Sequence, residues 1–271
     1  MDDLFGPEQA ARLIAVPGAD DDKYARGVVG FVTGSEGYPG AAVLGVEAAA
    51  RTGVGMIRYL GPERPSGLVL QRRPEVVTAD GRVQAWVLGS GQDAAQRDDA
   101  TRARLRKALG QEVPVVIDAG ALDLHAEARG PVLLTPHAGE LARAVGSSVE
   151  EVRADPERAA RDAAAALGAT VLLKGHTTHV ATPDGTLLRV RSAPAWLATA
   201  GAGDALAGIL GALLATHADA IARDPALVAR LAAAGAVLHG LAAERASAGG
   251  PLTILDLAAA LPRVIAGLLA A

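Results

Sequence analysis

The chain has 271 residues, half of them hydrophobic, and a formal net charge of −4. This length allows one large core, and the acidic balance argues against a nucleic-acid-binding surface, which needs a basic stripe. The absence of cysteine excludes disulfides and thiolate metal sites. We therefore expect one domain over residues 1–271, no nucleic-acid partner and a cytoplasmic location.

Apolar runs of strand length recur and alternate with segments of helical character. The strand-like runs are residues 27–33, 54–59, 82–88, 113–118, 132–135 and 170–174. Helical segments rich in Ala, Leu and Arg lie at 41–51, 98–109 and 156–167. This alternation predicts parallel strands joined by crossover helices, and runs that are apolar throughout predict strands covered on both faces. We expect an α/β fold with three α/β/α layers around a mostly parallel, doubly wound sheet.

The pattern changes after Thr178. Two short runs, 179–182 and 187–190, flank Pro183-Asp184-Gly185, a sequence that favours a tight turn. These runs predict a hairpin that adds an antiparallel edge to the sheet.

No segment predicts contact with a membrane. Residues 1–5 are acidic and lack the basic and apolar parts of a signal peptide. Residues 205–215 are apolar but too short to cross a bilayer, so they predict a buried helix. From Gly203 onward the chain is predicted to be helical, with breaks near 224–225 and 249–251. We expect no membrane partner.

Ligands of such sheets bind beyond the carboxyl ends of the strands, so the residues that open the following helices are candidates for the site. The strongest motif has two glycines and an aspartate, Thr199-Ala200-Gly201-Ala202-Gly203-Asp204. Backbone N–H groups of Gly201, Ala202 and Gly203, aided by the helix dipole, predict an anion hole. Asp204 is either a proton acceptor for a substrate hydroxyl or only a helix cap.

A second motif follows the buried strand at 170–174 and consists of Lys174-Gly175-His176-Thr177-Thr178. Lys174 can neutralise phosphate charge, Gly175 lets the main chain approach a nucleotide, and the threonines can bind its sugar or phosphates. A solvated lysine at a strand end is the alternative.

A third motif is Thr135-Pro136-His137-Ala138-Gly139-Glu140, in which Pro136 ends the strand and starts a turn toward a helix. His137 and Glu140 lie three residues apart, so they can share a helical face and hold a polar substrate or a water. They are too few to specify a metal site. The alternative is a histidine with only a structural role at the start of the helix.

Three weaker junctions place small or acidic residues just beyond a strand. They are Thr33-Gly34-Ser35 with Tyr38-Pro39-Gly40-Ala41-Ala42, then Leu88-Gly89-Ser90-Gly91, and Ile117-Asp118-Ala119-Gly120. Each alone is an ordinary tight turn, but their joint occurrence indicates one site. The P-loop motif is absent, and residues 89–91 lack the third glycine of a dinucleotide fingerprint, so neither a P-loop enzyme nor a Rossmann dehydrogenase is supported.

In matching order, from Tyr24 to Gly208, these motifs resemble the NAD(P)H-hydrate dehydratase family, the carboxyl-terminal YjeF-like domain of the ribokinase-like superfamily. Vitamin kinases of that superfamily typically have asparagine where this chain has His137. The chain departs from the family at Gly89-Ser90-Gly91-Gln92-Asp93, usually Gly-Pro-Gly-Leu-Gly, and at Trp196, in a segment often rich in Asn and Gly.

The resemblance implies a ribokinase-like fold and assigns site residues by matching position. Asp204 is implied as the catalytic base. The positions that match the hydrate-binding residues are Ala41, Ala42, Gly91, His137 and Asp204. Those that match the adenine-nucleotide residues are Lys174, Gly175, His176, Thr177, Thr178 and Gly203.

The resemblance further implies ADP-dependent dehydration of the (6S) hydrates of NADH and NADPH, NADHX and NADPHX, with Mg²⁺ beside the phosphates. It implies a homo-oligomer, commonly a tetramer, and the chain begins directly with the kinase-like domain, so we expect no epimerase activity. Two alternatives remain. One is a ribokinase-like kinase that phosphorylates a vitamin-type alcohol with Asp204 as the same base, and the other is a catalytically silent nucleotide-binding regulator.

Overall fold

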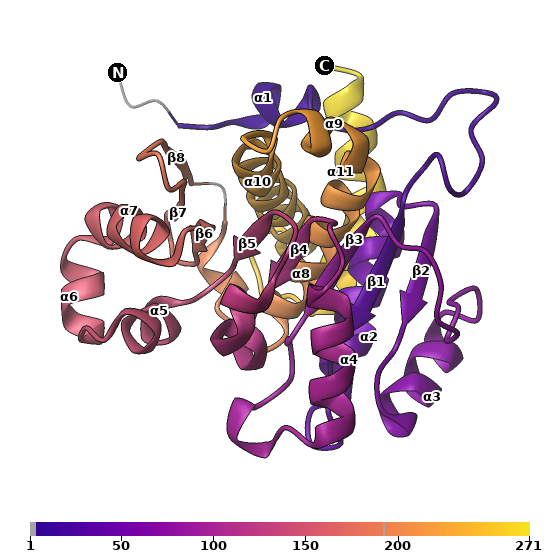
Figure 1. Ribbon diagram of the computed structural model, residues 1–271. Coiled ribbons are helices and arrows are strands. Elements are labelled where there is room, and N and C mark those ends of the chain that lie inside the picture. The colour runs from indigo at the N-terminus through magenta and orange to yellow at the C-terminus, as the bar shows by residue number, and fades with distance from the viewer. Residues whose placement is uncertain (1–3, 192) are drawn as a thin grey trace.

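The computed structural model describes residues 4–191 and 193–271, and its centre is an eight-stranded sheet (Figure 1). The strand order is β2-β1-β3-β4-β5-β6-β7-β8. The bounds are β1 Val28–Val32, β2 Met56–Tyr59, β3 Ala85–Leu88, β4 Val115–Ile117, β5 Val132–Leu134, β6 Thr170–Leu173, β7 Thr178–Ala181 and β8 Leu187–Val190. Strands β1 to β6 pair in parallel, whereas β7 pairs antiparallel with β6 and β8. The predicted parallel sheet and antiparallel edge hairpin are both confirmed.

Helices cover both faces of this sheet (Figure 1). The α-helices are α1 Pro7–Ala11, α2 Pro39–Thr52, α3 Glu63–Arg72, α4 Asp99–Leu109, α5 Ala138–Val145, α6 Val149–Ala154, α7 Pro156–Leu167, α8 Ala202–Thr216, α9 Ala218–Arg223, α10 Leu227–Ser247 and α11 Ile254–Leu269. The 3-10 helices are η1 Ala94–Gln96, η2 Ala119–Glu127 and η3 Ala195–Leu197. The helices predicted at 41–51, 98–109 and 156–167 correspond to α2, α4 and α7.

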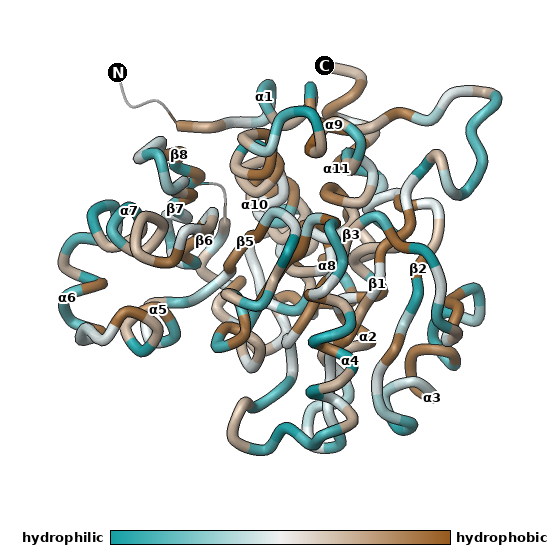
Figure 2. Tube along the Cα trace, viewed as in Figure 1, coloured by the Kyte–Doolittle hydropathy of each residue, from teal (hydrophilic) through white to brown (hydrophobic). Residues whose placement is uncertain are grey.

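Alternate residues of each central strand point into different layers. Val29 and Phe31 of β1 belong to a buried cluster with α2, α8, α10 and α11, whereas Val28 and Val32 belong to a second cluster with α4 and α7. A strand with apolar neighbours on both faces has no position left for a polar side chain, which explains the continuous apolar runs. Hydrophilic residues gather instead on outer helices such as α6 and α7 (Figure 2).

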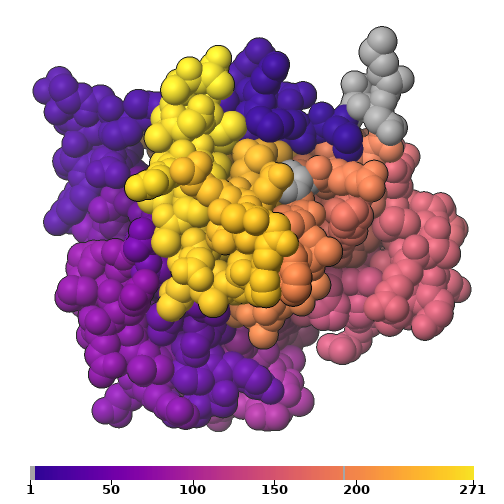
Figure 3. Space-filling view, turned by 180° about the vertical axis from the view of Figure 1, so that it is seen from behind, coloured from indigo at the N-terminus to yellow at the C-terminus, as the bar shows by residue number. Residues whose placement is uncertain are grey.

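Helix α10 is long and apolar enough to cross a membrane by length and composition alone. However, 83% of its most apolar stretch is buried inside the fold, as in the core helix of a soluble protein. Helix α11 at the C-terminus packs on α10 and α2 and covers the outside of this layer (Figure 3). Burial against neighbouring helices therefore accounts for the apolar character of α10.

Two glycines bring α2 and α8 into backbone contact. A Cβ atom added to Gly208 of α8 would lie 2.0 Å from the carbonyl oxygen of Gly45 in α2. A Cβ added to Gly45 would in turn lie 3.2 Å from the carbonyl oxygen of Asp204. This close approach leaves no room for a side chain between the helices, so it fixes the first turn of α8 at the carboxyl edge of the sheet.

Candidate active site

The carboxyl ends of β3, β4, β5 and β6 meet at one buried carboxylate, Asp118. Its Oδ1 accepts hydrogen bonds from Lys174 Nζ and from Thr135 Oγ1, both at 2.8 Å, and its Oδ2 accepts one from Ser90 Oγ at 3.0 Å. Asp118 is only 3% exposed. The sequence marks Asp118 merely as part of a weak junction, because its hydrogen-bond partners come from three other strand ends.

Lys174 follows β6 and reaches across this edge. Its Nζ lies 2.8 Å from Asp118 Oδ1 and 3.7 Å from Glu140 Oε2, and its side chain is 21% exposed. Burial alone would lower the pKa of Lys174, but the carboxylates of Asp118, Glu140 and Asp204 together outweigh burial and raise its pKa above the ordinary value. Lys174 is therefore a charged, enclosed ammonium rather than the solvated lysine that the sequence also allows.

The first turn of α8 lies directly beside this ammonium. The N-cap of α8 is Gly201, whose φ of +91° favours glycine, and a Cβ added there would also displace the Leu44 side chain, whose Cδ1 would lie 2.5 Å away. A Cβ added to Gly203 would lie 3.5 Å from Lys174 Nζ. The first N–H groups of a helix have no intrahelical partner, so Gly201 and Gly203 offer donors and a favourable dipole to an anion placed near Lys174. The N–H of Ala202 donates to the Thr199 carbonyl at 3.4 Å, a long hydrogen bond that an anion would have to displace.

Asp204 is the third residue of α8 and not its N-cap, so the interpretation as a mere N-cap is wrong. The pKa of Asp204 is raised to about 6, chiefly by burial and also by the charge of Asp118, against an opposing effect of Lys174. A carboxylate with a pKa close to neutrality can accept a proton during a reaction and release it afterwards. The geometry thus combines a carboxylate of raised pKa, an ammonium and the first turn of a helix.

His137 is the N-cap of α5. Its Nδ1 accepts hydrogen bonds from the backbone N–H groups of Gly139 at 3.0 Å and Glu140 at 3.3 Å, while Glu140 Oε2 accepts one from the His137 N–H at 2.8 Å. This reciprocal capping box holds the two side chains together at the start of α5, with His137 as the N-cap rather than a residue inside the helix. The structural role is thus present, and although Nε2 lies 3.5 Å from Glu140 Oε1, the His137 side chain is still 58% exposed.

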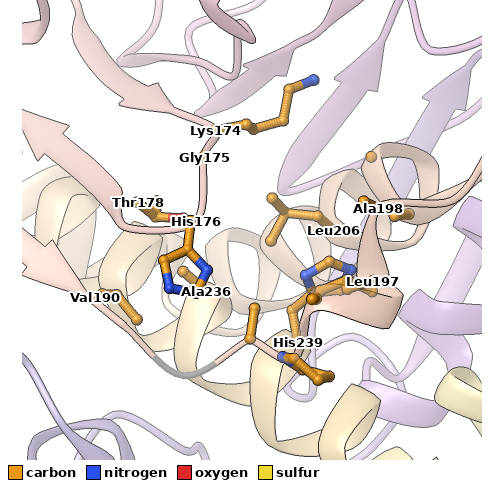
Figure 4. Close-up of a pocket in the computed structure, with 15 residues that line it drawn as sticks. Lys174, Gly175, His176, Thr178, Val190, Leu197, Ala198, Leu206, Ala236 and His239 are labelled. Carbon is orange, nitrogen blue, oxygen red and sulfur yellow. The ribbon is translucent and has the colours of Figure 1, made fainter. Parts of the chain in front are cut away.

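Three cavities open at this edge of the molecule. The first, of about 500 Å³, lies between α8, α10 and η3, and we call it the α8–α10 pocket (Figure 4). Five of the six predicted nucleotide residues line it, namely Lys174, Gly175, His176, Thr178 and Gly203. The sixth, Thr177, lines a neighbouring cavity of about 830 Å³ together with His137.

The third cavity, of about 850 Å³, is lined by Gly91, Tyr38, Gln92 and Glu140, and we call it the Gly91 cavity. Gly91 has a φ of +66°, and a Cβ there would lie 2.3 Å from the Cβ of Ala41. Of the predicted hydrate-binding residues, only Gly91 lines this cavity. Ala41 is buried behind Gly91, and the neighbouring Ala42 is fully enclosed.

Comparison with known proteins gives a consistent result. A model of the NAD(P)H-hydrate dehydratase family matches residues 29–263. The bifunctional NAD(P)H-hydrate repair enzyme Nnr of Mycobacterium tuberculosis is 45% identical over 224 residues, which cover 78% of this chain and 46% of that protein. The chain thus spans about half the length of this relative. An ADP-dependent (S)-NAD(P)H-hydrate dehydratase of Neisseria meningitidis serogroup B is 38% identical over 83% of this chain and 79% of its own length.

Solved structures show the same architecture. The ADP/ATP-dependent NAD(P)H-hydrate dehydratase from Bacillus subtilis, co-crystallized with ATP/Mg²⁺, matches with a TM-score of 0.86 and 27% identity over 99% of both chains. A ribokinase-like superfamily protein from Enterococcus faecalis matches with a TM-score of 0.82 at 22% identity over 98% of this chain and 95% of its own. The predicted ribokinase-like fold is therefore confirmed, and the family match over residues 29–263 shows that the chain belongs to the NAD(P)H-hydrate dehydratase family.

Proposed function

We propose that this protein catalyses the ADP-dependent dehydration of the (6S) hydrates of NADH and NADPH and so returns them to NADH and NADPH. The observation that carries the proposal is the placement of Asp204, with its raised pKa, beside the Lys174 ammonium and the first turn of α8. This arrangement offers a base for a hydroxyl and an anion site for the phosphoryl group that the hydroxyl would attack. The relative from Neisseria meningitidis, named as ADP-dependent, supports the choice of nucleotide.

In the first step, Asp204 accepts the proton from the C6 hydroxyl of the hydrate. The hydroxyl oxygen then forms a bond to the terminal phosphorus of ADP, and AMP leaves. Lys174 and the backbone N–H groups of Gly201, Ala202 and Gly203 stabilise the charge on the transferred phosphoryl group. The protein contributes mainly position and electrostatics, as in other phosphoryl transfers.

In the second step, the C6–O bond breaks and inorganic phosphate leaves with the bonding electron pair. The lone pair of the ring nitrogen assists this departure, and loss of a proton from the neighbouring ring carbon restores the dihydropyridine. The sum converts one hydrate and one ADP into one NAD(P)H, one AMP and one phosphate. A kinase would stop after the first step and accumulate a phosphorylated product.

A divalent cation fits this site without a cage of protein ligands. Among the described residues, no group of three or more His, Asp or Glu side chains is placed to hold a metal ion. Mg²⁺ usually keeps several waters and binds through substrate phosphates with one or two carboxylates, which Asp118 or Glu140 beside Lys174 would supply. When bound, Mg²⁺ would neutralise phosphate charge during the transfer.

The experiment that tests this function uses acid-hydrated NADH with Mg²⁺ and either ADP or no nucleotide. We expect absorbance of the reduced nicotinamide to recover only with ADP, and AMP, phosphate and NADH to form in equal amounts. Recovery without nucleotide would contradict the proposal. Consumption of ADP with a stable phosphorylated product would favour the kinase.

The protonation state of Asp204, the proposed base, determines the expected pH dependence of the reaction. Because Asp204 has a pKa of about 6, it is protonated below this pH and then cannot accept the hydroxyl proton. We therefore expect kcat/KM for the hydrate to fall about tenfold per pH unit below about pH 6 and to level off above it. Initial rates measured from pH 4.5 to 8 test this expectation. A kcat/KM that does not change with pH over this range would exclude Asp204 as the base.

Two substitutions of His137 distinguish a role in hydrate binding from a role in capping α5. His137→Asn keeps a side chain that caps helices well but lacks Nε2, whereas His137→Ala loses both. If the exposed imidazole edge contacts the hydrate, both variants raise KM for the hydrate more than KM for ADP. Only His137→Ala lowers the stability, by about 1 kcal/mol. Steady-state kinetics and thermal melting distinguish the two losses, and equal rises in both KM values would place His137 elsewhere.

A further inference from the structure

His239 lies in the middle of α10, within a motif-free stretch that the sequence does not mark for function. Its side chain is buried, with 7% of the residue exposed, and it lines the α8–α10 pocket. Its Nε2 atom is shielded from solvent and has no hydrogen-bond partner. A buried polar atom without a partner is uncommon in folded proteins and calls for an explanation. Because Nε2 is shielded from the empty pocket as well, a bound ligand supplies the missing partner when the imidazole turns this edge into the pocket that it lines.

The chemistry of the pocket makes His239 stand out. Most of its lining is apolar, from Val190 on β8 through η3 to Leu206 and Ala236. Among the described lining residues, the polar side chains are Lys174, His176, Thr178 and His239. In the close-up, Lys174 and His239 lie on opposite sides of the pocket, with Leu206 between them (Figure 4). Cofactor sites of this kind combine apolar walls with a few polar groups that fix orientation.

The charge state of His239 suits an uncharged ligand group. The pKa of His239 is lowered to about 4, chiefly by burial and also by the charge of Lys174, against the opposing effect of a hydrogen bond with the backbone of Ala202. The imidazole is therefore neutral at pH 7, with one donor and one acceptor nitrogen. A neutral imidazole surrounded by apolar side chains is better suited to hydrogen-bond an uncharged nucleoside than to bind a charged phosphate.

We propose that His239 hydrogen-bonds the nucleoside half of ADP and thereby acts as a specificity-determining residue of the nucleotide site. The inference rests on the proposed function and takes the α8–α10 pocket as the ADP site, because five of the six predicted nucleotide residues line it. Lys174 and Gly203 then hold the phosphates at one side, and the apolar walls enclose the planar base. His239 supplies a polar contact at the other side.

The test compares ADP with pyrophosphate, which has the phosphates but no nucleoside. In His239→Leu, an apolar side chain of similar size, we expect Kd for ADP by calorimetry to rise about tenfold, the effect of one lost hydrogen bond. Kd for pyrophosphate should change less than twofold. His239→Gln, which retains a donor and an acceptor near the position of Nε2, should recover part of the ADP affinity.

A purely structural role predicts a different pattern. If His239 only supports the first turn of α8 through Ala202, ADP and pyrophosphate lose affinity equally and kcat falls, which would overturn the proposal. A nucleoside contact instead raises KM for ADP at nearly unchanged kcat. His217→Leu is the control, since His217 lies at the far end of α8 and should leave ADP binding unchanged. Failure of the wild-type protein to bind ADP would refute the proposed function itself, a result distinct from equal losses in the variant.

Discussion

Asp204→Asn is expected to abolish turnover while ADP binding persists. Asparagine has nearly the same size but is a very poor proton acceptor, so the rate should fall by about 10²-fold or more. ADP affinity should remain, because the phosphates are held by Lys174 and the first turn of α8. Turnover of acid-hydrated NADH and calorimetric titration with ADP measure the two properties separately.

Stability provides the control for Asp204→Asn. The pKa of Asp204 in the folded state, about 6, is above the value of about 3.9 for an unfolded aspartate. Above pH 6 the unfolded chain therefore holds the charge more easily, and ionisation of Asp204 destabilises the fold. The variant should melt at the same or a higher temperature at pH 7.5. A variant that keeps most of its turnover would refute the role of Asp204 as base.

Lys174→Met is expected to impair both nucleotide use and folding. Removal of the ammonium takes away the charge that stabilises the transferred phosphoryl group, so kcat/KM for ADP should fall about 10²-fold. It also leaves the buried Asp118 without its counter-ion, a change that typically costs about 3–5 kcal/mol. Chemical denaturation and steady-state kinetics measure these losses.

A double variant separates the two effects of Lys174. Lys174→Met with Asp118→Asn removes both charges, and an asparagine at 118 can still pair with the hydroxyls of Thr135 and Ser90. We expect stability to recover while ADP use stays low. Recovery of ADP use would mean that Lys174 serves only to neutralise Asp118. Lys107→Met is the matched control, since Lys107 forms an exposed ion pair with Asp80 and should affect neither property.

Much of the fold follows from local sequence patterns. Each of the six parallel strands lies inside an apolar run, and the turn at Pro183-Asp184-Gly185 separates the predicted hairpin strands. These elements were predictable because burial on both faces of a sheet imposes apolar runs and because turns need particular residues. The helix that begins after His137 was predicted from Pro136 and is α5, whereas the short helices α1, α3 and α6 were not predicted, since few residues define each and packing on neighbours stabilises them.

The sequence alone determined which strand ends carry chemical groups, because glycine, lysine, aspartate and histidine follow strands at fixed places in the chain. Only the tertiary structure decided which of these groups meet. Asp118 is a shared hydrogen-bond acceptor because β3, β5 and β6 end beside it, and His239 reaches the pocket because α10 packs behind α8. Such contacts join residues far apart in the chain, and they depend on helix packing as close as that between Gly45 and Gly208, which no local pattern encodes.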